Sequence, residues 1–220
     1  LRLHSGGAMQ LVQAKIRNFR SLRNVTVEFG AHTAFIGGNG AGKSSLLTLI
    51  GRLARMDAGA AVVGGLDVAT AKTRTLAQRL AVLRQENHLA IRLTVADLVG
   101  FGRFPHGGQR QRAFVAMAVA QDTDYLLLDE PLNNLDPRHA VALMKLLTEL
   151  AEQRGLTIVV VMHDINTAAQ FADSIIAMKD GRIHCHGTVD DVVTVPNLST
   201  LYETPVRVER IGERRVVLWD

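Results

Sequence analysis

Two patterns of apolar residues run along this chain of 220 residues and predict most of its elements. Residues 125–128 and 156–162 are continuous apolar runs, which are typical of strands buried on both faces of a parallel sheet. Between them, residues 138–153 repeat apolar side chains at helical spacing. The apolar face of this helix is formed by Val141, Met144, Leu147 and Leu150. Two such strands joined by one helix predict an α/β fold with a mostly parallel sheet.

Shorter apolar runs predict further strands on both sides of this unit. Residues 11–16 and 25–29 alternate between apolar and polar side chains and should pair as antiparallel strands before a strand at 33–36. Lys179-Asp180-Gly181-Arg182 predicts a hairpin turn. It would join strands at 174–178 and 183–185. The other expected strands are a short edge strand at 61–63 and strands at 80–83, 206–209 and 216–218. The other expected helical segments are 45–50, 75–79, 94–99, 110–120, 165–171 and 189–193.

A glycine-rich segment lies between the strand at 33–36 and the helix at 45–50. It reads Gly37-Gly38-Asn39-Gly40-Ala41-Gly42-Lys43-Ser44, which fits G-x-x-x-x-G-K-S, the phosphate-binding loop of nucleotide hydrolases. Glycines let backbone N–H groups close around phosphates, and the following helix directs its positive N-terminal end at them. Lys43 would contact the β- and γ-phosphates, and the Ser44 hydroxyl would bind Mg²⁺. The strand–loop–helix context argues against a chance glycine turn and predicts a nucleoside triphosphate site.

Three polar residues follow the two buried strands. Asp129 and Glu130 end the run at 125–128, where Asp129 would hold Mg²⁺, usually through water, and Glu130 would orient the attacking water. The alternative is that both merely end a strand and face solvent. The phosphate loop on a neighbouring strand favours the catalytic role, because ligands of open α/β sheets bind at the carboxyl edge. His163 follows the run at 156–162, and we expect it to contact the γ-phosphate there rather than to be an ordinary polar residue.

Composition limits the class of protein. With 47% hydrophobic and 21% charged residues, the chain has the make-up of a soluble globular protein. Its net charge of +4 fits an acidic ligand or an anionic membrane surface, but is too small to indicate nucleic-acid binding. The single cysteine, Cys185, cannot form an internal disulfide, and no apolar run resembles a membrane span or a secretory leader. We expect a cytoplasmic location, and we expect residues 1–8, which precede Met9, to be a cloning remnant.

Six segments resemble, in the same order, the motifs of the ATP-binding-cassette (ABC) ATPases. They are Walker A at 37–44, the Q-loop glutamine Gln85, the signature at 107–112, Walker B at 126–130, the D-loop at 133–136 and the switch histidine His163. The amino-acid sequences of four segments are also similar to those of the ATPase subunits of iron–siderophore importers. These segments are 85–88, 101–105, 132–136 and 162–166.

The resemblance implies a fold and a set of site residues. The fold is one domain over 9–220: an ABC-ATPase (RecA-like) core, an N-terminal antiparallel β subdomain and a helical subdomain at about 88–120. The catalytic residues would be Glu130, His163 and Gln85. Besides the loop from Gly37 to Ser44, the residues contacting ATP would be Ser45, Gly107, Gly108, Gln109, Asp129 and Asp136. The residues contacting Mg²⁺ would be Ser44, Gln85 and Asp129.

The resemblance also implies partners. The chain would be the ATP-hydrolysing subunit of an importer for ferric chelates, peripheral on the inner face of the cell membrane. Two such subunits would pair head to tail, each ATP lying between Walker A of one subunit and the signature of the other. The region around Gln85 would contact a transmembrane permease, and a substrate-binding protein would deliver the chelate. Nucleic acid has no part in this interpretation.

Two segments depart from the importer pattern. Only 21 residues lead from Gln85 to His106, where the family has a longer helical subdomain, and the signature lacks its usual Leu-Ser entry. Either the helical subdomain is shortened or a segment is missing from the sequence between His106 and Gly107. Because both flanks match the family and only the join does not, we favour the missing segment.

The second departure is N-terminal. Residues 16–25 are more similar to DNA-repair ATPases of the same superfamily, and no aromatic residue is assigned to stack on adenine, since Phe19 fits the core better. A soluble ATPase acting on nucleic acid is therefore the alternative hypothesis. Against this alternative, the present chain lacks the long insertion that such proteins carry between the Q-loop and the signature. A third hypothesis is a nucleotide-binding regulator that hydrolyses poorly because its signature is damaged.

Overall fold

The computed structural model describes residues 12–16, 22, 25–84, 119–133 and 135–219, and the fold is given for these residues. The expected helices at 94–99 and 110–120, Gln85, Phe19 and the signature glycines Gly107 and Gly108 with Gln109 lie outside them, apart from residues 119–120. Among the described residues, no helix combines the length and the apolar character needed to cross a bilayer.

A six-stranded sheet forms the centre of the molecule, in the order β10-β9-β3-β8-β7-β6. Its strands are β3 (His32–Ile36), β6 (Leu80–Leu83), β7 (Tyr125–Asp129), β8 (Thr157–Val161), β9 (Ser174–Lys179) and β10 (Arg182–Thr188). Five of them run parallel, and β10 returns antiparallel to β9 through the predicted hairpin turn. The predicted α/β class with a mostly parallel sheet is confirmed.

The central strands are buried on both faces, which explains their continuous apolar runs. In β8, Ile158 and Val160 belong to one core cluster, whereas Val159 and Val161 belong to the other. In β7, Leu126 and Leu127 divide in the same way. Because successive side chains of a strand point to opposite faces, one strand contributes to both clusters. The sheet therefore forms a rigid layer between two cores, and its carboxyl edge is held in place from both sides.

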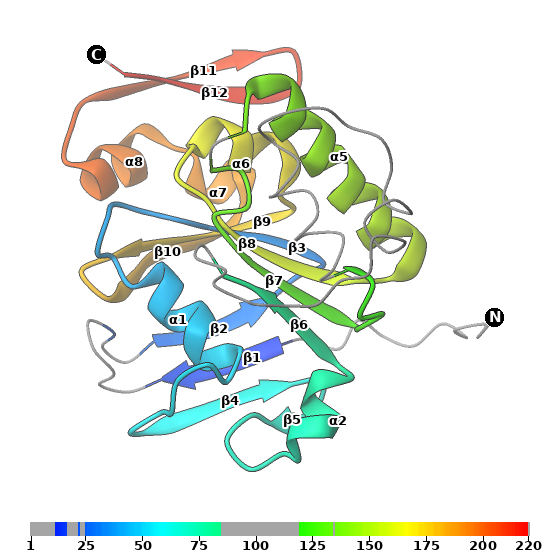
Figure 1. The fold of residues 1–220 in the computed structure, drawn as a ribbon. Helices are drawn as coiled ribbons and strands as arrows, with labels where there is room; N and C mark the ends of the chain where they lie inside the picture. Colours follow the sequence, from blue (N-terminus) through cyan, green and yellow to red (C-terminus); the bar gives the residue numbers. More distant parts are fainter. Residues whose placement is uncertain (1–11, 17–21, 23–24, 85–118, 134, 220) are drawn as a thin grey trace.

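The upper layer in Figure 1 is helical and ends in a separate hairpin. Its elements are α5 (Pro137–Arg154), α6 (Ile165–Phe171), α7 (Val189–Val192), α8 (Val195–Tyr202), β11 (Val206–Ile211) and β12 (Arg214–Trp219). Helix α8 was not predicted, since its Pro, Asn, Ser and Thr residues are weak helix formers. Its start signals were nevertheless present: Thr194 caps the helix by accepting from the N–H of Asn197, and Pro196 stands in the first turn.

The lower layer holds α1 (Lys43–Ile50) and a four-stranded antiparallel sheet. The sheet has the order β2-β1-β4-β5, and a short helix α2 follows it. These elements are β1 (Val12–Ile16), β2 (Val25–Phe29), β4 (Gly59–Val63), β5 (Leu66–Asp67) and α2 (Thr73–Ala77). The predicted pairing of the two N-terminal strands is confirmed. The ring of Phe29 meets that of Phe35 edge to face, with centroids 5.7 Å apart, and so joins this sheet to the central one.

Two details of the prediction are wrong. The strand at 61–63 is not an edge strand, because β4 pairs with β1 on one side and with the short β5 on the other. In α5, Val141 is 39% exposed, and Leu143 and Ala151 are buried beside Met144 and Leu147. The buried face is thus turned relative to the predicted one, toward the sheet that the helix covers.

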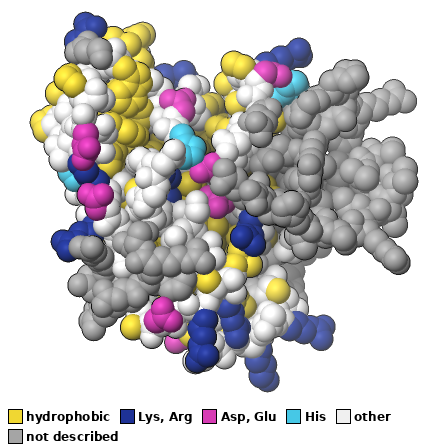
Figure 2. Space-filling view, turned by 60° about the vertical axis from the view of Figure 1, so that its left-hand side comes forward, with side chains coloured by type: hydrophobic (Ala, Val, Ile, Leu, Met, Phe, Trp, Pro, Cys, Tyr) yellow, Lys and Arg dark blue, Asp and Glu magenta, His cyan; other side chains and the backbone are white. Residues whose placement is uncertain are grey.

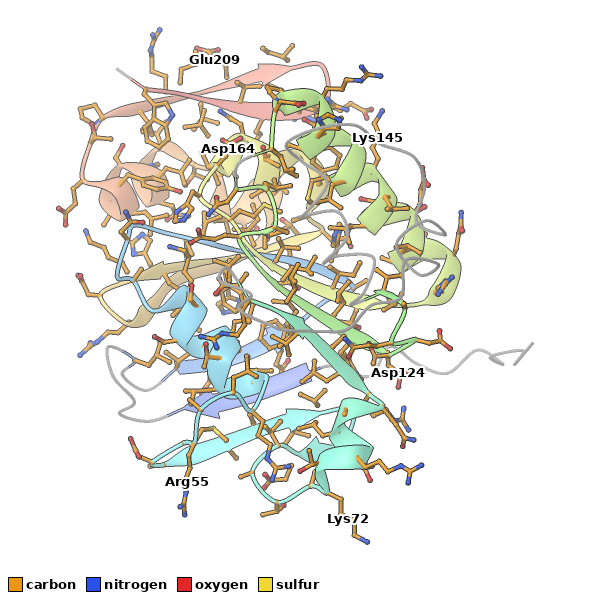
Figure 3. The ribbon with its side chains drawn as sticks, viewed as in Figure 1. Arg55, Lys72, Asp124, Lys145, Asp164 and Glu209 are labelled. Carbon is orange, nitrogen blue, oxygen red and sulfur yellow. The ribbon has the colours of Figure 1, made fainter. Side chains whose placement is uncertain are left out.

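Charged side chains are unevenly distributed over the face shown in Figure 2. Lysine and arginine side chains gather along the lower edge of the view in Figure 2. Arg55 and Lys72, labelled in Figure 3, lie at that end of the molecule, beside β4 and α2. Acidic and histidine side chains lie together near the centre of the face in Figure 2.

Candidate functional site

The loop between β3 and α1 leaves the carboxyl end of the central sheet and enters a helix through glycine. Gly42 is the N-cap of α1 with φ +99°, and it offers no side chain to bond the first N–H groups. The first four N–H groups of any helix lack partners within the helix, so those of α1 remain available for an anion. Gly38, Asn39 and Gly40 are exposed, whereas Ala41 and Lys43 are buried beneath them. The loop therefore leaves backbone N–H groups free to bind a phosphate, as the predicted site requires.

Gly37 is the position of this loop with the least space. Its φ is +142°, and a Cβ atom placed there would lie 2.1 Å from the carbonyl oxygen of Met178 at the end of β9. Only glycine fits both the backbone angle and this close approach. Gly38, the next residue, has nothing within 4 Å of such a Cβ. Gly37 and Gly38 are therefore adjacent glycines of which only Gly37 lacks room for a side chain, so the same substitution can be compared at both.

We expect Gly37→Ala to lower the free energy of unfolding by more than about 3 kcal/mol, since left-handed strain of roughly 1–3 kcal/mol adds to a backbone overlap. Gly38→Ala should change it by less than about 1 kcal/mol. Gly40→Ala should fall between them, because Gly40 has φ +77° but open space around it. Urea unfolding followed by circular dichroism measures the three values. Equal losses for Gly37→Ala and Gly38→Ala would contradict the geometry of the loop.

Lys43 is enclosed by the loop that precedes it. Its Nζ atom donates to the carbonyl oxygens of Gly37 at 2.8 Å and Gly38 at 2.9 Å, and the residue is 5% exposed. Burial lowers the pKa of Lys43, and the nearby carboxylates of Glu130 and Asp129 act in the opposite direction. The loop thus holds a lysine ammonium next to the helix N-terminus, and these two positive features can act on the same anion.

Ser44 and Asp129 connect the loop to β7. The Ser44 hydroxyl donates to Oδ1 of Asp129 at 2.9 Å, and Asp129 is 6% exposed. Burial raises the pKa of Asp129, the hydrogen bond from Ser44 lowers it, and the charge of Glu130 raises it further. Two hard oxygen donors at this distance fit Mg²⁺, which takes one or two protein ligands together with water and substrate phosphates. The residues present therefore suit the ion that the sequence predicts.

Glu130 is held on two sides. Oε1 lies 2.6 Å from Nε2 of His163, and Oε2 accepts from the side-chain amide of Asn133 at 2.5 Å. The main-chain N–H of Glu130 donates to the carbonyl of Val161, and its φ of +51° is unusual for a residue with a side chain. Such strain persists where the surroundings impose it, often at functional sites. The carboxylate is consequently fixed in direction, with a half-exposed histidine as its neighbour.

The structure brings five of the predicted site residues together, namely Lys43, Ser44, Asp129, Glu130 and His163. All follow or end β3, β7 or β8 at the same edge of the sheet. The alternative that Asp129 and Glu130 face solvent is excluded by their burial. Asn133 is a site residue that the sequence named only as part of the D-loop.

Asp136 has a separate structural duty in this chain. It is the N-cap of α5, accepting from the N–H of His139 at 2.9 Å, and the ring of His139 lies against its other oxygen. These hydrogen bonds lower the pKa of Asp136. Its predicted contact with ATP stays a prediction, as does that of Ser45 and of the residues outside the described ranges.

The arrangement can bind a polyphosphate and hydrolyse it. A lysine ammonium and a helix N-terminus can together bind one anion, an oxygen pair can hold a divalent cation, and a fixed carboxylate can orient water. Phosphoryl transfer asks little more of a protein than this positioning and charge stabilisation.

Comparison with known proteins agrees with this chemistry. A family model described as "ABC transporter" matches residues 22–102. The petrobactin import ATP-binding protein YclP of Bacillus subtilis is 40% identical, the match covering 88% of this chain and 90% of that protein. FatE of Bacillus anthracis, also a petrobactin import ATP-binding protein, is 43% identical over 84% of this chain and 88% of its own. The ferric enterobactin transport ATP-binding protein FepC of Escherichia coli is 34% identical, over 81% and 80%.

Solved structures show the same fold. The bacterial ABC transporter cassette MJ0796 has a TM-score of 0.68 at 23% identity, covering 82% of this chain and 99% of that one. Cassette cbiO1 from Clostridium perfringens has a TM-score of 0.68 at 21% identity, covering 86% and 92%.

The alignment with YclP bears on the short spacing before Gly107. It runs over 227 positions, whereas 88% of 220 residues is about 194, so about 33 positions of YclP have no counterpart in this chain. A shortfall of this size agrees with the reduced distance between Gln85 and the signature.

Proposed function

The chain belongs to the ATP-binding subunits of ABC transporters, an ATPase family, and we propose that it powers an importer of ferric siderophores. ATP hydrolysis is supported by the arrangement at the carboxyl edge of the sheet. There the side chains of five residues meet, namely Lys43, Ser44, Asp129, Glu130 and His163. The importer part is supported by relatives named for petrobactin and ferric enterobactin import or transport, matched over more than four fifths of this chain.

We propose the following roles within one catalytic site. The N–H groups at the start of α1 and the ammonium of Lys43 hold the β- and γ-phosphates of ATP. Glu130 accepts a proton from the attacking water, and His163 and Asn133 hold its two oxygens in place. Mg²⁺, held by Ser44 and Asp129, would neutralise the charge of the phosphates. Gln85 and the signature residues Gly107, Gly108 and Gln109 would complete the site, as the resemblance implies.

The proposed partners follow from the same family. A pair of these chains would enclose ATP between the loop of one and the signature of the other, and would dock on transmembrane permease subunits at the inner face of the membrane. A substrate-binding protein would act further upstream. Specificity for a chelate would lie in those partners, so we assign it to no residue of this chain. The nucleic-acid alternative is not favoured, because the compared relatives are transport proteins.

Reconstitution tests the proposed function. The purified chain is mixed with liposomes holding the permease subunits of a ferric petrobactin importer, and phosphate release is measured with the binding protein and radiolabelled ferric petrobactin. We expect ATP hydrolysis to rise several-fold and label to enter the liposomes only with ATP and Mg²⁺. Double-stranded DNA added instead of the liposomes should leave hydrolysis unchanged. Stimulation by DNA without any response to the permease would overturn the importer role and support the alternative.

A further inference from the structure

Helix α6 begins two residues after His163 and has little of its own to hold it in position. It contains seven residues, and only Ile165 and Ala168 are buried. A helix of this length is not stable alone in water, so its position depends on what it packs against. Its main neighbour among the described elements is β12, the last strand of the chain. The C-terminal hairpin β11–β12 is therefore the natural support of the helix that follows the switch histidine (Figure 1).

One side chain joins the two elements. The amide nitrogen of Asn166 donates to the carbonyl oxygen of Val217 at 3.1 Å, and its amide oxygen accepts from the N–H of Val217 at 2.8 Å. Val217 stands opposite Val208 in the hairpin, yet both of its main-chain groups bond to α6. Asn166 thus takes the place of a neighbouring strand at the edge of β12. No other type of side chain reproduces this pair of bonds at this length, because only the Asn amide presents one donor and one acceptor so close to the backbone.

The hairpin is itself fixed to the body of the molecule by alternate residues of β12, which share one face. Arg215 donates to the carbonyl of Val193 at 3.1 Å and pairs with Asp190 at 2.5 Å. Val217 is 2% exposed and belongs to the same core cluster as Ile158 and Val160, and the ring of Trp219 meets that of Tyr202 of α8 edge to face, with centroids 5.1 Å apart. Because it contacts α7 and α8 as well as α6, the hairpin is held in a defined position on the molecule.

Only a few residues separate the contact between the hairpin and α6 from the candidate site. Asp164 caps α6 by accepting from the N–H groups of Asn166 at 3.0 Å and Thr167 at 3.2 Å. Figure 3 shows Asp164 beneath the hairpin, on whose outer side Glu209 lies. Burial raises the pKa of Tyr202 to about 12, and the charge of Asp164 adds to this. The next residue toward the N-terminus is His163, bonded to Glu130.

We propose that Asn166 is a positioning residue for ATP hydrolysis: by tying α6 to β12, it fixes the direction from which His163 reaches Glu130. The inference rests on the role proposed above for His163. It makes the C-terminal hairpin part of the hydrolysis machinery. Loosening the hairpin should lower turnover without weakening the binding of ATP, since the phosphate loop belongs to the opposite layer and contacts neither α6 nor β12 through any bond described.

The test uses the full chain and compares Asn166→Ala with Asn197→Ala. Asn197 donates its amide to the carbonyls of Asp191 and Val192 in the same layer and makes no bond to α6, so it is the matched control. We expect kcat to fall about 10-fold in Asn166→Ala, while the Kd for ATP stays within about twofold, and both to be unchanged in Asn197→Ala. Asn166→Asp keeps the acceptor for the N–H of Val217 but turns a carboxylate oxygen toward the carbonyl of Val217 in place of the donor, so its kcat should fall at least as far as that of Asn166→Ala.

A double-mutant cycle separates positioning from a general loss of structure. If Asn166 acts through His163, then Asn166→Ala should have no further effect on kcat in a His163→Ala background. Equal fractional losses in both backgrounds, or a Kd that rises with the fall in kcat, would overturn the proposal. If Asn166→Ala does not fold, Trp219→Ala replaces it, because this change loosens the same strand at a half-exposed position. Its effect on kcat is then measured with and without His163→Ala.

The proposed function and this inference fail in different ways. Wild-type chain without Mg²⁺-dependent hydrolysis, or hydrolysis that survives Glu130→Gln, would remove the proposed function itself. Wild-type hydrolysis that depends on Glu130 but is indifferent to Asn166→Ala would leave the function standing and remove only the role of Asn166.

Discussion

Replacing Glu130 with glutamine should lower kcat for ATP hydrolysis by about 100-fold or more, the usual contribution of a general base, and leave the Kd for ATP within about threefold. Glutamine has the shape of glutamate and can keep contacts to His163 and Asn133, but it cannot take a proton from water. The strained φ of +51° belongs to the backbone, which the substitution should leave in place. The change therefore removes the base and little else. Phosphate release and ATP binding by fluorescence measure the two quantities.

Glu149→Gln is the control for this prediction. Glu149 is exposed on α5, so the loss of one negative charge there should change neither kcat nor Kd. A Glu130→Gln variant with the kcat of the wild type would show that Glu130 is not the base. A variant that neither binds ATP nor melts like the wild type would instead show that the carboxylate holds the site together.

The features predicted best from sequence are those fixed by neighbouring residues. The phosphate loop depends on glycines within eight positions, and Asp129 and Glu130 follow directly on a strand whose apolar run is unmistakable. Once parallel strands were predicted, their carboxyl ends had to meet at one edge, and this brought His163 to Glu130 across 33 positions of sequence.

The features that the sequence did not reveal depend on contacts distant along the chain. Asn133 and Asn166 are ordinary polar residues until their partners are known, and Val217 lies 51 positions from Asn166. The exposure of Val141 follows from how α5 is turned on the sheet, which helical spacing alone does not determine. Helix α8 was missed because its composition is poor in helix formers, although the core around Leu198 and Leu201 stabilises it.

The site gathers charges at some cost to stability. Lys43, Asp129 and Glu130 are each less than 10% exposed, and burial disfavours the charged forms of Lys43 and Asp129, as the directions of their pKa changes show. The hydrogen bonds from Lys43 to the loop and from Ser44 to Asp129 offset part of this cost. Such an arrangement is explained by ligand binding better than by folding, because a buried polar cluster seldom stabilises a fold more than apolar residues would.

Lys43→Ala should accordingly weaken ATP binding by about 100-fold, or ~2.7 kcal/mol, which lies in the range for removing one member of a buried charge pair. ATP would present its phosphates to the ammonium, which the loop carbonyls hold next to the N-terminus of α1. The effect on unfolding should be much smaller. Lys43→Ala removes one donor from each of two loop carbonyls, of which that of Gly38 still accepts from the N–H of Ala41, and it relieves the burial of a charge.

Lys145→Ala is the control, since Lys145 is exposed on α5, far from the loop (Figure 3). Titration of a fluorescent ATP analogue gives the Kd of each variant, and urea unfolding gives its stability. If Lys43→Ala binds ATP as the wild type does, then the helix N-terminus alone holds the phosphates. If it loses several kcal/mol of stability, then Lys43 serves the fold rather than the ligand. Weak binding in a stable protein is the result that the buried, hydrogen-bonded ammonium leads us to expect.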